Sequence, residues 1–314
     1  MLEVQGLNTF RGPAHVLRDL GLRVGDAETV CLVGRNGAGK TTTIDSIMGL
    51  LPIKSGTVTL NGRDITRLPA HERALSGIGY SPEDAGIFPD LTVAENFQIG
   101  RSAAKGARRA GEGIDPRVFE LFPEVREFTS RRGLFLSGGQ KKMVGIARAL
   151  TLGPSILLLD EPFEGLAPVI VSRFIEAAKR IKAMGVSLLI AESNLMTASR
   201  VADRLYAIDR GEIIFEGPPA RAFEHQEVMG TSGTSVLYDP HAPGGGSGRG
   251  HEQRCRDAGP RLHHRAAGAR AHHLRGRAFM GQQPCGVARR RFRHSRGRPV
   301  GGDRWPARSS SPSS

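Results

Sequence analysis

Cysteine is scarce in this sequence, and two hallmarks of secreted or membrane-spanning chains are missing. The 314 residues include three cysteines, Cys31, Cys255 and Cys285, whose unrelated spacings form neither a disulfide framework nor a zinc knuckle. No apolar stretch reaches the ~20 residues that span a bilayer, and Met1 is not followed by a basic segment and an apolar signal core. We therefore expect a cytoplasmic protein that meets a membrane only through a partner.

Lysine and isoleucine are absent from residues 231–314, which differ sharply from the rest of the chain. This tail holds sixteen arginines against four acidic residues and so carries +12 of the net charge of +13. The first 230 residues are nearly neutral, with 28 basic and 27 acidic side chains. The pI near 10.6 therefore describes the tail alone. We expect no nucleic-acid partner for the folded part.

The tail shows no sustained apolar period, so it cannot bury a core and is expected to be disordered. Three interpretations compete: a basic nucleic-acid-binding tail, a histidine metal tract at His263-His264 and His272-His273, or sequence read out of frame. The abrupt change in composition favours the third. We thus predict a folded domain over 1–230 and a low-complexity tail over 231–314.

Hydrophobic patterns in the first 230 residues predict an α/β fold. Residues 1–7 and 16–24 alternate apolar and polar side chains, which indicates an N-terminal antiparallel sheet. Continuous apolar runs at 155–159 and 186–191 flank a helical pattern at 169–184, as in a parallel β–α–β unit. Residues 85–147 lack such runs and indicate a helical insertion beside a mixed sheet, and a hairpin over 206–216 closes the domain.

A phosphate-loop motif lies between a predicted strand, Thr29–Val33, and a predicted helix over 41–50. Glycines let successive N–H groups point at phosphate oxygens, and the helix start adds a favourable dipole. We expect Lys40 to reach the β- and γ-phosphates, Thr41 to ligate Mg²⁺ and Thr42 to bond the α-phosphate region. A merely flexible turn would not need these flanking elements. The loop residues expected around the nucleotide are Gly34, Asn36, Gly37, Ala38, Gly39, Lys40, Thr41 and Thr42.

Two carboxylates, Asp160 and Glu161, end a buried apolar strand at the edge where parallel sheets bind ligands. Burying two uncompensated acids is costly, so each needs a function. We interpret Asp160 as a Mg²⁺ ligand, through water, and Glu161 as the general base that polarises the attacking water. The alternative is an exposed pair that begins a loop.

A second helix start with phosphate-binding character occurs at Ser137, Gly138, Gly139 and Gln140. Taken alone, this segment could equally be a helix N-terminus capped by Ser137. Its position some twenty residues before the Asp160–Glu161 strand favours a nucleotide-linked role.

Taken in their order along the chain, the phosphate loop, the Ser137–Gln140 segment and the Asp160–Glu161 pair closely resemble the ATP-binding cassette (ABC) family. The resemblance covers residues 1 to about 230. The resemblance implies a P-loop NTPase core that binds ATP and Mg²⁺ and hydrolyses ATP. It also implies that the Ser137–Gln140 element contacts the γ-phosphate held by a second cassette. Function would then require a dimer, homomeric or heteromeric.

Further roles follow from the resemblance one residue at a time. Phe10 stands where an aromatic side chain stacks on adenine, although it could equally belong to the core. Glu83 takes the position of a glutamine that contacts Mg²⁺ or water and touches the membrane partner. Gly165–Ala167 matches the loop that crosses the dimer interface. Ser193 stands where the family usually has a histidine that contacts the γ-phosphate. This departure could slow ATP hydrolysis at the nucleotide site that this chain contributes to the dimer.

A narrower match is to the ATP-binding subunits of branched-chain amino-acid importers. It rests on Pro82-Glu83, on Ile87–Pro89 with Leu91–Asn96, and on Gly165–Val171. Such a subunit would sit on the cytoplasmic face of the inner membrane, with permease subunits, a second cassette and an external substrate-binding protein. The alternatives are a cassette for urea, amides or lipopolysaccharide, a soluble cassette ATPase, and a nonfunctional product.

Overall fold

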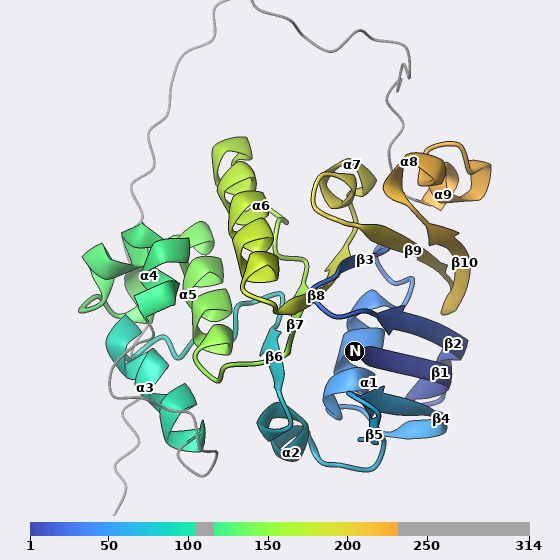
Figure 1. Cartoon of the computed structure of the whole chain (residues 1–314), viewed down its shortest axis with the longest axis horizontal. Helices are drawn as coiled ribbons and strands as arrows, with labels where there is room; N and C mark the ends of the chain where they lie inside the picture. Colours follow the sequence, from blue (N-terminus) through green and yellow to red (C-terminus); the bar gives the residue numbers. More distant parts are fainter. Residues whose placement is uncertain (105–115, 232–314) are drawn as a thin grey trace, which may run out of the picture. The chain divides into compact units, whose positions relative to one another are not determined.

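The computed structural model describes residues 1–104 and 116–231, and these fold around two sheets (Figure 1). Beyond Thr231, the predicted tail lies outside the described residues, so the expectations for it stay predictions. The α/β fold with an antiparallel N-terminal sheet and a helical insertion is confirmed. None of the helices within the described ranges has the length and hydropathy that crossing a membrane requires.

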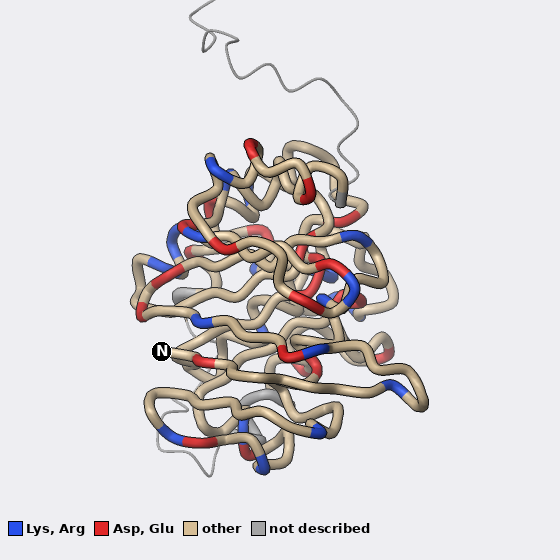
Figure 2. Tube along the Cα trace, turned by 90° about the vertical axis from the view of Figure 1, so that its right-hand side faces the viewer, with Lys and Arg blue, Asp and Glu red and all other residues tan. Residues whose placement is uncertain are grey.

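The first sheet is antiparallel and has the strand order β2-β1-β4-β5. Its strands are β1 (Leu2–Arg11), β2 (Ala14–Val24), β4 (Ile53–Leu60) and β5 (Arg63–Asp64). Asn61 and Gly62 join β4 to β5 with φ angles of 51° and 77°, as a tight two-residue hairpin turn requires. Figure 2, which looks from the side of this sheet, shows acidic and basic residues interspersed along the chain.

The second sheet has the order β10-β9-β3-β8-β7-β6 and is parallel except for β10, which pairs antiparallel with β9. Its strands are β3 (Thr29–Val33), β6 (Ile78–Ser81), β7 (Ile156–Asp160), β8 (Ser187–Glu192), β9 (Arg204–Asp209) and β10 (Glu212–Gly217). Every residue of β3, β7 and β8 is buried, because helices or the first sheet cover both faces.

Successive residues of β3 enter two different hydrophobic cores. Cys31 and Val33 pack with the helices on one face, whereas Val30 and Leu32 pack toward the first sheet. Helix α1 (Lys40–Met48) lies between the two sheets, as Figure 1 shows, and contacts both. Cys31 is a buried core residue, and burial raises the pKa of its thiol well above the usual value.

The remaining helices cover the second sheet and form the insertion. They are α2 (Ala70–Leu75), α3 (Val93–Ala104), α4 (Pro116–Leu121), α5 (Gly138–Leu150), α6 (Pro168–Ala183), α7 (Leu195–Ser199), α8 (Pro219–Ala222) and α9 (Gln226–Thr231), with 3₁₀ turns at Pro123–Phe128 and Gly133–Phe135. The predicted insertion over 85–147 thus corresponds to α3, α4, the two turns and most of α5.

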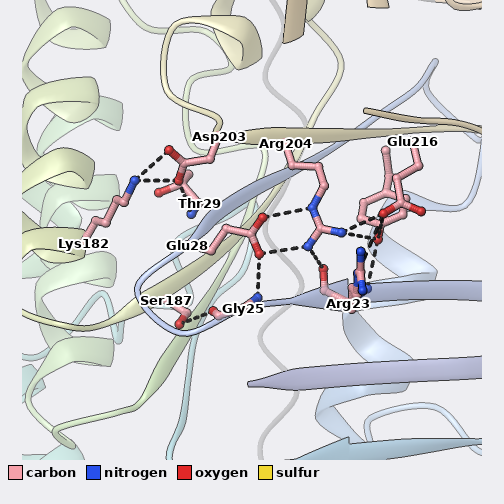
Figure 3. A network of polar contacts seen from close by, with 10 residues as sticks. Arg23, Gly25, Glu28, Thr29, Lys182, Ser187, Asp203, Arg204 and Glu216 are labelled. Carbon is pink, nitrogen blue, oxygen red and sulfur yellow. Dashed lines mark hydrogen bonds and ion pairs between the residues drawn. The ribbon is translucent and has the colours of Figure 1, made fainter. Parts of the chain in front are cut away.

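A polar network joins the two sheets at the amino ends of the parallel strands (Figure 3). The guanidinium of Arg204 donates to both carboxylate oxygens of Glu28 at 2.9 Å and to Glu216 at 2.7 Å. It also donates to the carbonyl of Arg23 on β2, at 3.0 Å. This network leaves the opposite edge of the sheet, where the strands end, free for the candidate site.

Candidate functional site

The phosphate loop and the acidic residues lie at the carboxyl ends of three neighbouring parallel strands. Gly34 follows β3, Asp160 ends β7 and Glu192 ends β8, and the register pairs Val33 with Glu192 and Asp160 with Ala191. Ligands of parallel sheets bind at this edge because loops and helix starts converge on it.

The loop between β3 and α1 follows the sheet edge closely, and its glycines are required by its geometry. A Cβ atom at Gly34 would lie 2.4 Å from the carbonyl oxygen of Ile208, so no larger residue fits. Gly37 and Gly39 adopt φ angles of 84° and 119°, which side-chain-bearing residues rarely adopt. The loop is closed by Lys40, whose ammonium group donates to the carbonyls of Gly34, at 2.7 Å, and Arg35, at 3.1 Å.

Asp160 is a buried carboxylate without a satisfying partner. It is 2% exposed, and neither carboxylate oxygen has a hydrogen bond of regular geometry within the described residues. Burial raises its pKa to about 6, while the nearby hydroxyl of Thr41 acts in the opposite direction. An orphaned carboxylate beside a threonine hydroxyl fits a site for Mg²⁺, which takes few protein ligands and completes its shell with phosphate and water.

Glu161 lies at the centre of the site in a strained conformation. Its φ angle is 46°, unusual for a non-glycine residue and typical of functional positions. Its carboxylate forms a buried ion pair with Lys40, at 3.0 Å, and accepts hydrogen bonds from the hydroxyl of Ser193, at 2.7 Å, and from its N–H, at 3.1 Å. Asn36 also accepts from this hydroxyl, at 3.3 Å.

Glu192 is a third buried acid that the sequence analysis did not select. It accepts hydrogen bonds from the N–H groups of Ser193 and Asn194, at 3.0 and 3.1 Å, and its second oxygen has no partner within the described residues. Burial, and then the charge of Glu161, raise its pKa to about 7. The signal that could have found it is the one that found Asp160, an acid at the end of a fully apolar strand.

A cavity of about 460 Å³ opens beside these residues. Its lining includes most of the phosphate loop, the start of α1, Glu83 and Glu161, so these parts of the predicted site meet there. The lining residues are Arg11, Val16, Asn36, Gly37, Gly39, Lys40, Thr41, Thr42, Glu83, Glu161 and Glu164.

Phe10 is not brought into this cavity. Its ring stacks on His15, with centroids 4.3 Å apart and the planes 5° from parallel, and His15 is hydrogen-bonded to Asn8. The next residue, Arg11, lines the cavity instead. Neighbouring side chains of a strand point to opposite faces, so of two adjacent residues on β1 only one can face the cavity.

The Ser137–Gln140 segment also lies apart from the lining of this cavity and forms a regular helix cap. The hydroxyl of Ser137 accepts from the N–H of Gln140, and the amide oxygen of Gln140 accepts from the N–H of Ser137. Ser137 and Gly138 are exposed, and a Cβ at Gly138 would meet nothing within 4 Å. The helix start is therefore open to an incoming group.

Lys142, on the same helix, connects this segment to the loop that follows β7. Its ammonium group donates to the carbonyls of Glu161 and Glu164, the latter at 3.1 Å. Burial lowers its pKa, against the opposing effect of nearby carboxylates. The sequence offered no local signal for Lys142, because its partners are main-chain groups in a loop about twenty residues away.

Comparisons with known proteins agree with this arrangement. A family model described as ABC transporter matches residues 17–164. The lipopolysaccharide export system ATP-binding protein LptB of Haemophilus influenzae is 37% identical over 217 residues, which cover 68% of this chain and 88% of that protein. The probable branched-chain amino acid transport ATP-binding protein LivF of Archaeoglobus fulgidus is 34% identical over 231 residues, which cover 72% and 96%.

A solved structure extends the likeness to three dimensions. The ADP conformation of an ATP-binding cassette of an ABC transporter superposes with a TM-score of 0.64 at 26% identity, covering 73% of this chain and 97% of that one.

Proposed function

The chain belongs to the ABC transporter family, and from that premise we propose that it drives the import of branched-chain or other small hydrophobic amino acids. As a member of that family it is an ATPase subunit of a transporter with the P-loop cassette fold. We take residues 1–230 as the cassette. The observation that carries the ATPase part of the proposal is the buried ion pair of Lys40 and Glu161 beside the cavity that the phosphate loop lines, with Ser193 hydrogen-bonded to Glu161.

In the proposed mechanism the loop amides and Lys40 bind the phosphates of ATP. Lys40 is at present held by two loop carbonyls and by Glu161. When the β- and γ-phosphates enter, they offer the ammonium group several negatively charged oxygens as partners. Lys40 then exchanges Glu161 for phosphate, which leaves the carboxylate of Glu161 free to orient water and accept its proton.

The chain's residues also suit a metal ion. Thr41 and Asp160 would hold Mg²⁺, with Glu83 facing it from the cavity wall. When bound, Mg²⁺ neutralises charge that develops on the phosphate oxygens. Asp160 would lose its unfavourable isolation in the same step, because its orphaned oxygens would gain a partner.

Ser193 is proposed to act at the γ-phosphate in place of histidine. Its hydroxyl donates to Glu161 at 2.7 Å, so it orients the carboxylate before ATP binds. A hydroxyl carries no positive charge, however, and offers the γ-phosphate a weaker contact than an imidazolium would. We expect Ser193→His to raise the hydrolysis rate if phosphate contact limits this half-site.

A second cassette is proposed to complete the site. The exposed start of α5 at Ser137 is open, although it lies outside the lining of this chain's own cavity. Nearby apolar side chains are solvent-exposed, with Leu134, Phe135 and Val169 at 59%, 67% and 68%. Exposed apolar groups beside an open helix N-terminus fit an interface that closes over a phosphate. The permease subunits and an external binding protein would complete the importer, with this chain at the cytoplasmic face.

Three observations bear on the cargo. The match to LivF covers 96% of that protein, and the match to the branched-chain amino acid transport protein BraG of Pseudomonas aeruginosa covers 97%, at 32% identity. The Gly165–Val171 segment, which follows Glu161, also supports this type. The match to LptB, at 37% identity over 88% of its length, favours lipopolysaccharide export as the second candidate.

Uptake measurements in cells distinguish the two candidates. A strain lacking this chain should lose uptake of radiolabelled leucine, isoleucine or valine, and the wild-type chain should restore it. Glu161→Gln should fail to restore it and should lower the ATPase rate of the purified assembly by about 100-fold or more. Normal amino-acid uptake in the deletion strain, with lipopolysaccharide retained at the inner membrane, would reject import in favour of export.

A further inference from the structure

The lining of the cavity around Lys40 also includes Arg11 and Val16, to which the mechanism assigns no role. A nucleotide brings to this cavity a planar base as well as its phosphates. We propose that the guanidinium of Arg11 is the surface on which the base of the bound nucleotide stacks, with Val16 beside it. This inference rests on the proposed function and names the residue that recognises the base within the same site.

The strand pattern places Arg11 on the correct face. Thr9 contacts Ser46 of α1 through their hydroxyl groups, at 3.0 Å, so this face of β1 looks onto the helix that follows the phosphate loop. Arg11 is two residues further along and reaches the same helix, whereas Phe10 lies between them and stacks on His15. The ring of Phe10 therefore faces away from α1.

Two contacts fix the guanidinium plane without covering it. The Nε–H group donates to the hydroxyl of Thr42, at 3.0 Å, and Nη2 donates to Asp45, at 2.7 Å. Both contacts use one edge of the group, and the Arg11 side chain stays 45% exposed. A planar cation held by its edge presents a flat face, and such faces pack well on aromatic rings. Because the orientation is already set, little conformational entropy is lost on binding.

Asp45 explains why this guanidinium suits a base better than a phosphate. Its carboxylate pairs with Arg11 and also accepts from the hydroxyl of Tyr80, at 3.3 Å. The negative charge offsets that of the guanidinium and disfavours a phosphate at the same place, whereas a neutral purine is unaffected. The Thr42 hydroxyl accepts from Arg11, so its own proton remains available for the α-phosphate region.

Calorimetric titration of the full chain with ATP and with inorganic tripolyphosphate, both with Mg²⁺, separates base binding from phosphate binding. We expect Arg11→Ala to bind ATP about tenfold more weakly. Its affinity for tripolyphosphate should change by less than about threefold, because Asp45 already offsets the Arg11 charge. Arg18→Ala is the matched control: it removes one positive charge from an exposed position of the same hairpin.

Two substitutions distinguish stacking from charge. Arg11→Tyr restores a flat surface without charge and should bind ATP as tightly as the wild-type chain, whereas Arg11→Lys keeps the charge and should resemble Arg11→Ala. The reverse order of these two variants would overturn the proposal, as would equal losses of ATP and tripolyphosphate affinity in Arg11→Ala. A tenfold loss in Phe10→Ala with none in Arg11→Ala would move the base to Phe10 and also overturn it.

The same titrations show which hypothesis fails. A wild-type chain that binds neither ATP nor tripolyphosphate contradicts the proposed function itself. A wild-type chain that binds both, with ATP affinity unchanged in Arg11→Ala, contradicts only the role of Arg11. The melting temperature of each variant, measured without ligand, shows that Arg11 variants are folded at the temperature of titration.

Discussion

Asp160, at the end of β7, shows a conflict between the stability of the ligand-free protein and the function proposed for the site. Asp160 is buried with no regular hydrogen bond from the described residues, and its pKa is raised to about 6 by burial. Such a group destabilises the ligand-free protein when it is ionised. Active sites retain strained or unpaired groups of this kind because their partners arrive with the substrate.

The substitution Asp160→Asn should therefore stabilise the ligand-free protein while abolishing ATP hydrolysis. Because the folded pKa of Asp160, about 6, lies above its ordinary 3.8, the folded state binds the extra proton and stability falls as pH rises through this window. At pH 8, in EDTA and without nucleotide, we expect a gain of about 1–2 kcal/mol in denaturant unfolding.

At pH 5 the advantage of Asp160→Asn should shrink, since the wild-type carboxyl is then mostly protonated. The exposed Asp90→Asn serves as the charge-matched control. A less stable Asp160→Asn at pH 8, or a gain that stays the same at both pH values, would contradict the view that an isolated charge is buried here.

The positions of site residues could be predicted from the sequence where a motif fixes the local geometry. Lys40, Thr41 and Glu161 line the expected cavity. The glycine loop and the start of α1 fix the directions of the Lys40 and Thr41 side chains, and the end of β7 fixes the position of Glu161. The sequence could not tell which of Phe10 and Arg11 contacts α1, because the side chains of neighbouring strand residues point to opposite faces; in the structure Phe10 stacks on His15 and Arg11 reaches α1.

At the scale of elements, helix α1 needs its carboxyl end fixed to keep the phosphate loop in place. The buried guanidinium of Arg73 donates to the carbonyls of Ser46 and Ile47, at 2.8 and 2.7 Å. It also donates to the carbonyls of Thr66 and Leu68, at 2.6 and 2.8 Å. A cation at the negative end of the helix dipole is favourable.

Replacing Arg73 by methionine should destabilise the fold by about 2–4 kcal/mol, because four carbonyls lose their donor in a buried place. Urea unfolding with a spectroscopic readout measures this loss. Arg67→Met, which changes an exposed residue of the same connection, should stay within about 0.5 kcal/mol of the wild type. Equal, small effects for both variants would mean that Arg73 does not hold the end of α1.

Elements with a strong hydrophobic pattern were predicted correctly, and the short helices were missed. The runs in β3, β7 and β8 and the helix α6 carry their own hydrophobic signal. The short helices α2, α7, α8 and α9 have four to six residues each, too few for a period to be visible. They are set by tertiary contacts such as those of Arg73.

At the scale of the whole molecule, the Arg204 network of Figure 3 joins elements far apart in sequence. Burial raises the pKa of Glu28, but hydrogen bonds from Arg204 and from the N–H of Gly25 outweigh it, so the pKa is lowered overall. Its ionised form therefore stabilises the fold. That stabilisation is present above the ordinary value of 4.5 and is lost as pH falls through the lower folded value.

Glu28→Gln should cost roughly 1 kcal/mol of stability at pH 7, since Glu28 is partly exposed. The difference from the wild type should close as pH falls below 4.5 and through the lowered pKa of Glu28 in the folded state. Unfolding curves at these pH values measure it, with the exposed Glu212→Gln as control. If the difference in unfolding free energy stays unchanged at low pH, the ionised carboxylate of Glu28 is not the source of the stabilisation, which would contradict this prediction.

The most direct test of the whole mechanism is the MgATP affinity of Lys40→Ala, measured by calorimetry on the full chain and followed by uptake in cells. Because the ammonium group of Lys40 lies in the phosphate loop and is expected to bind the β- and γ-phosphates directly, we expect at least a tenfold loss of affinity and no uptake. A Lys40→Ala chain with wild-type affinity that still supports transport would contradict the assignment of this cavity to the triphosphate.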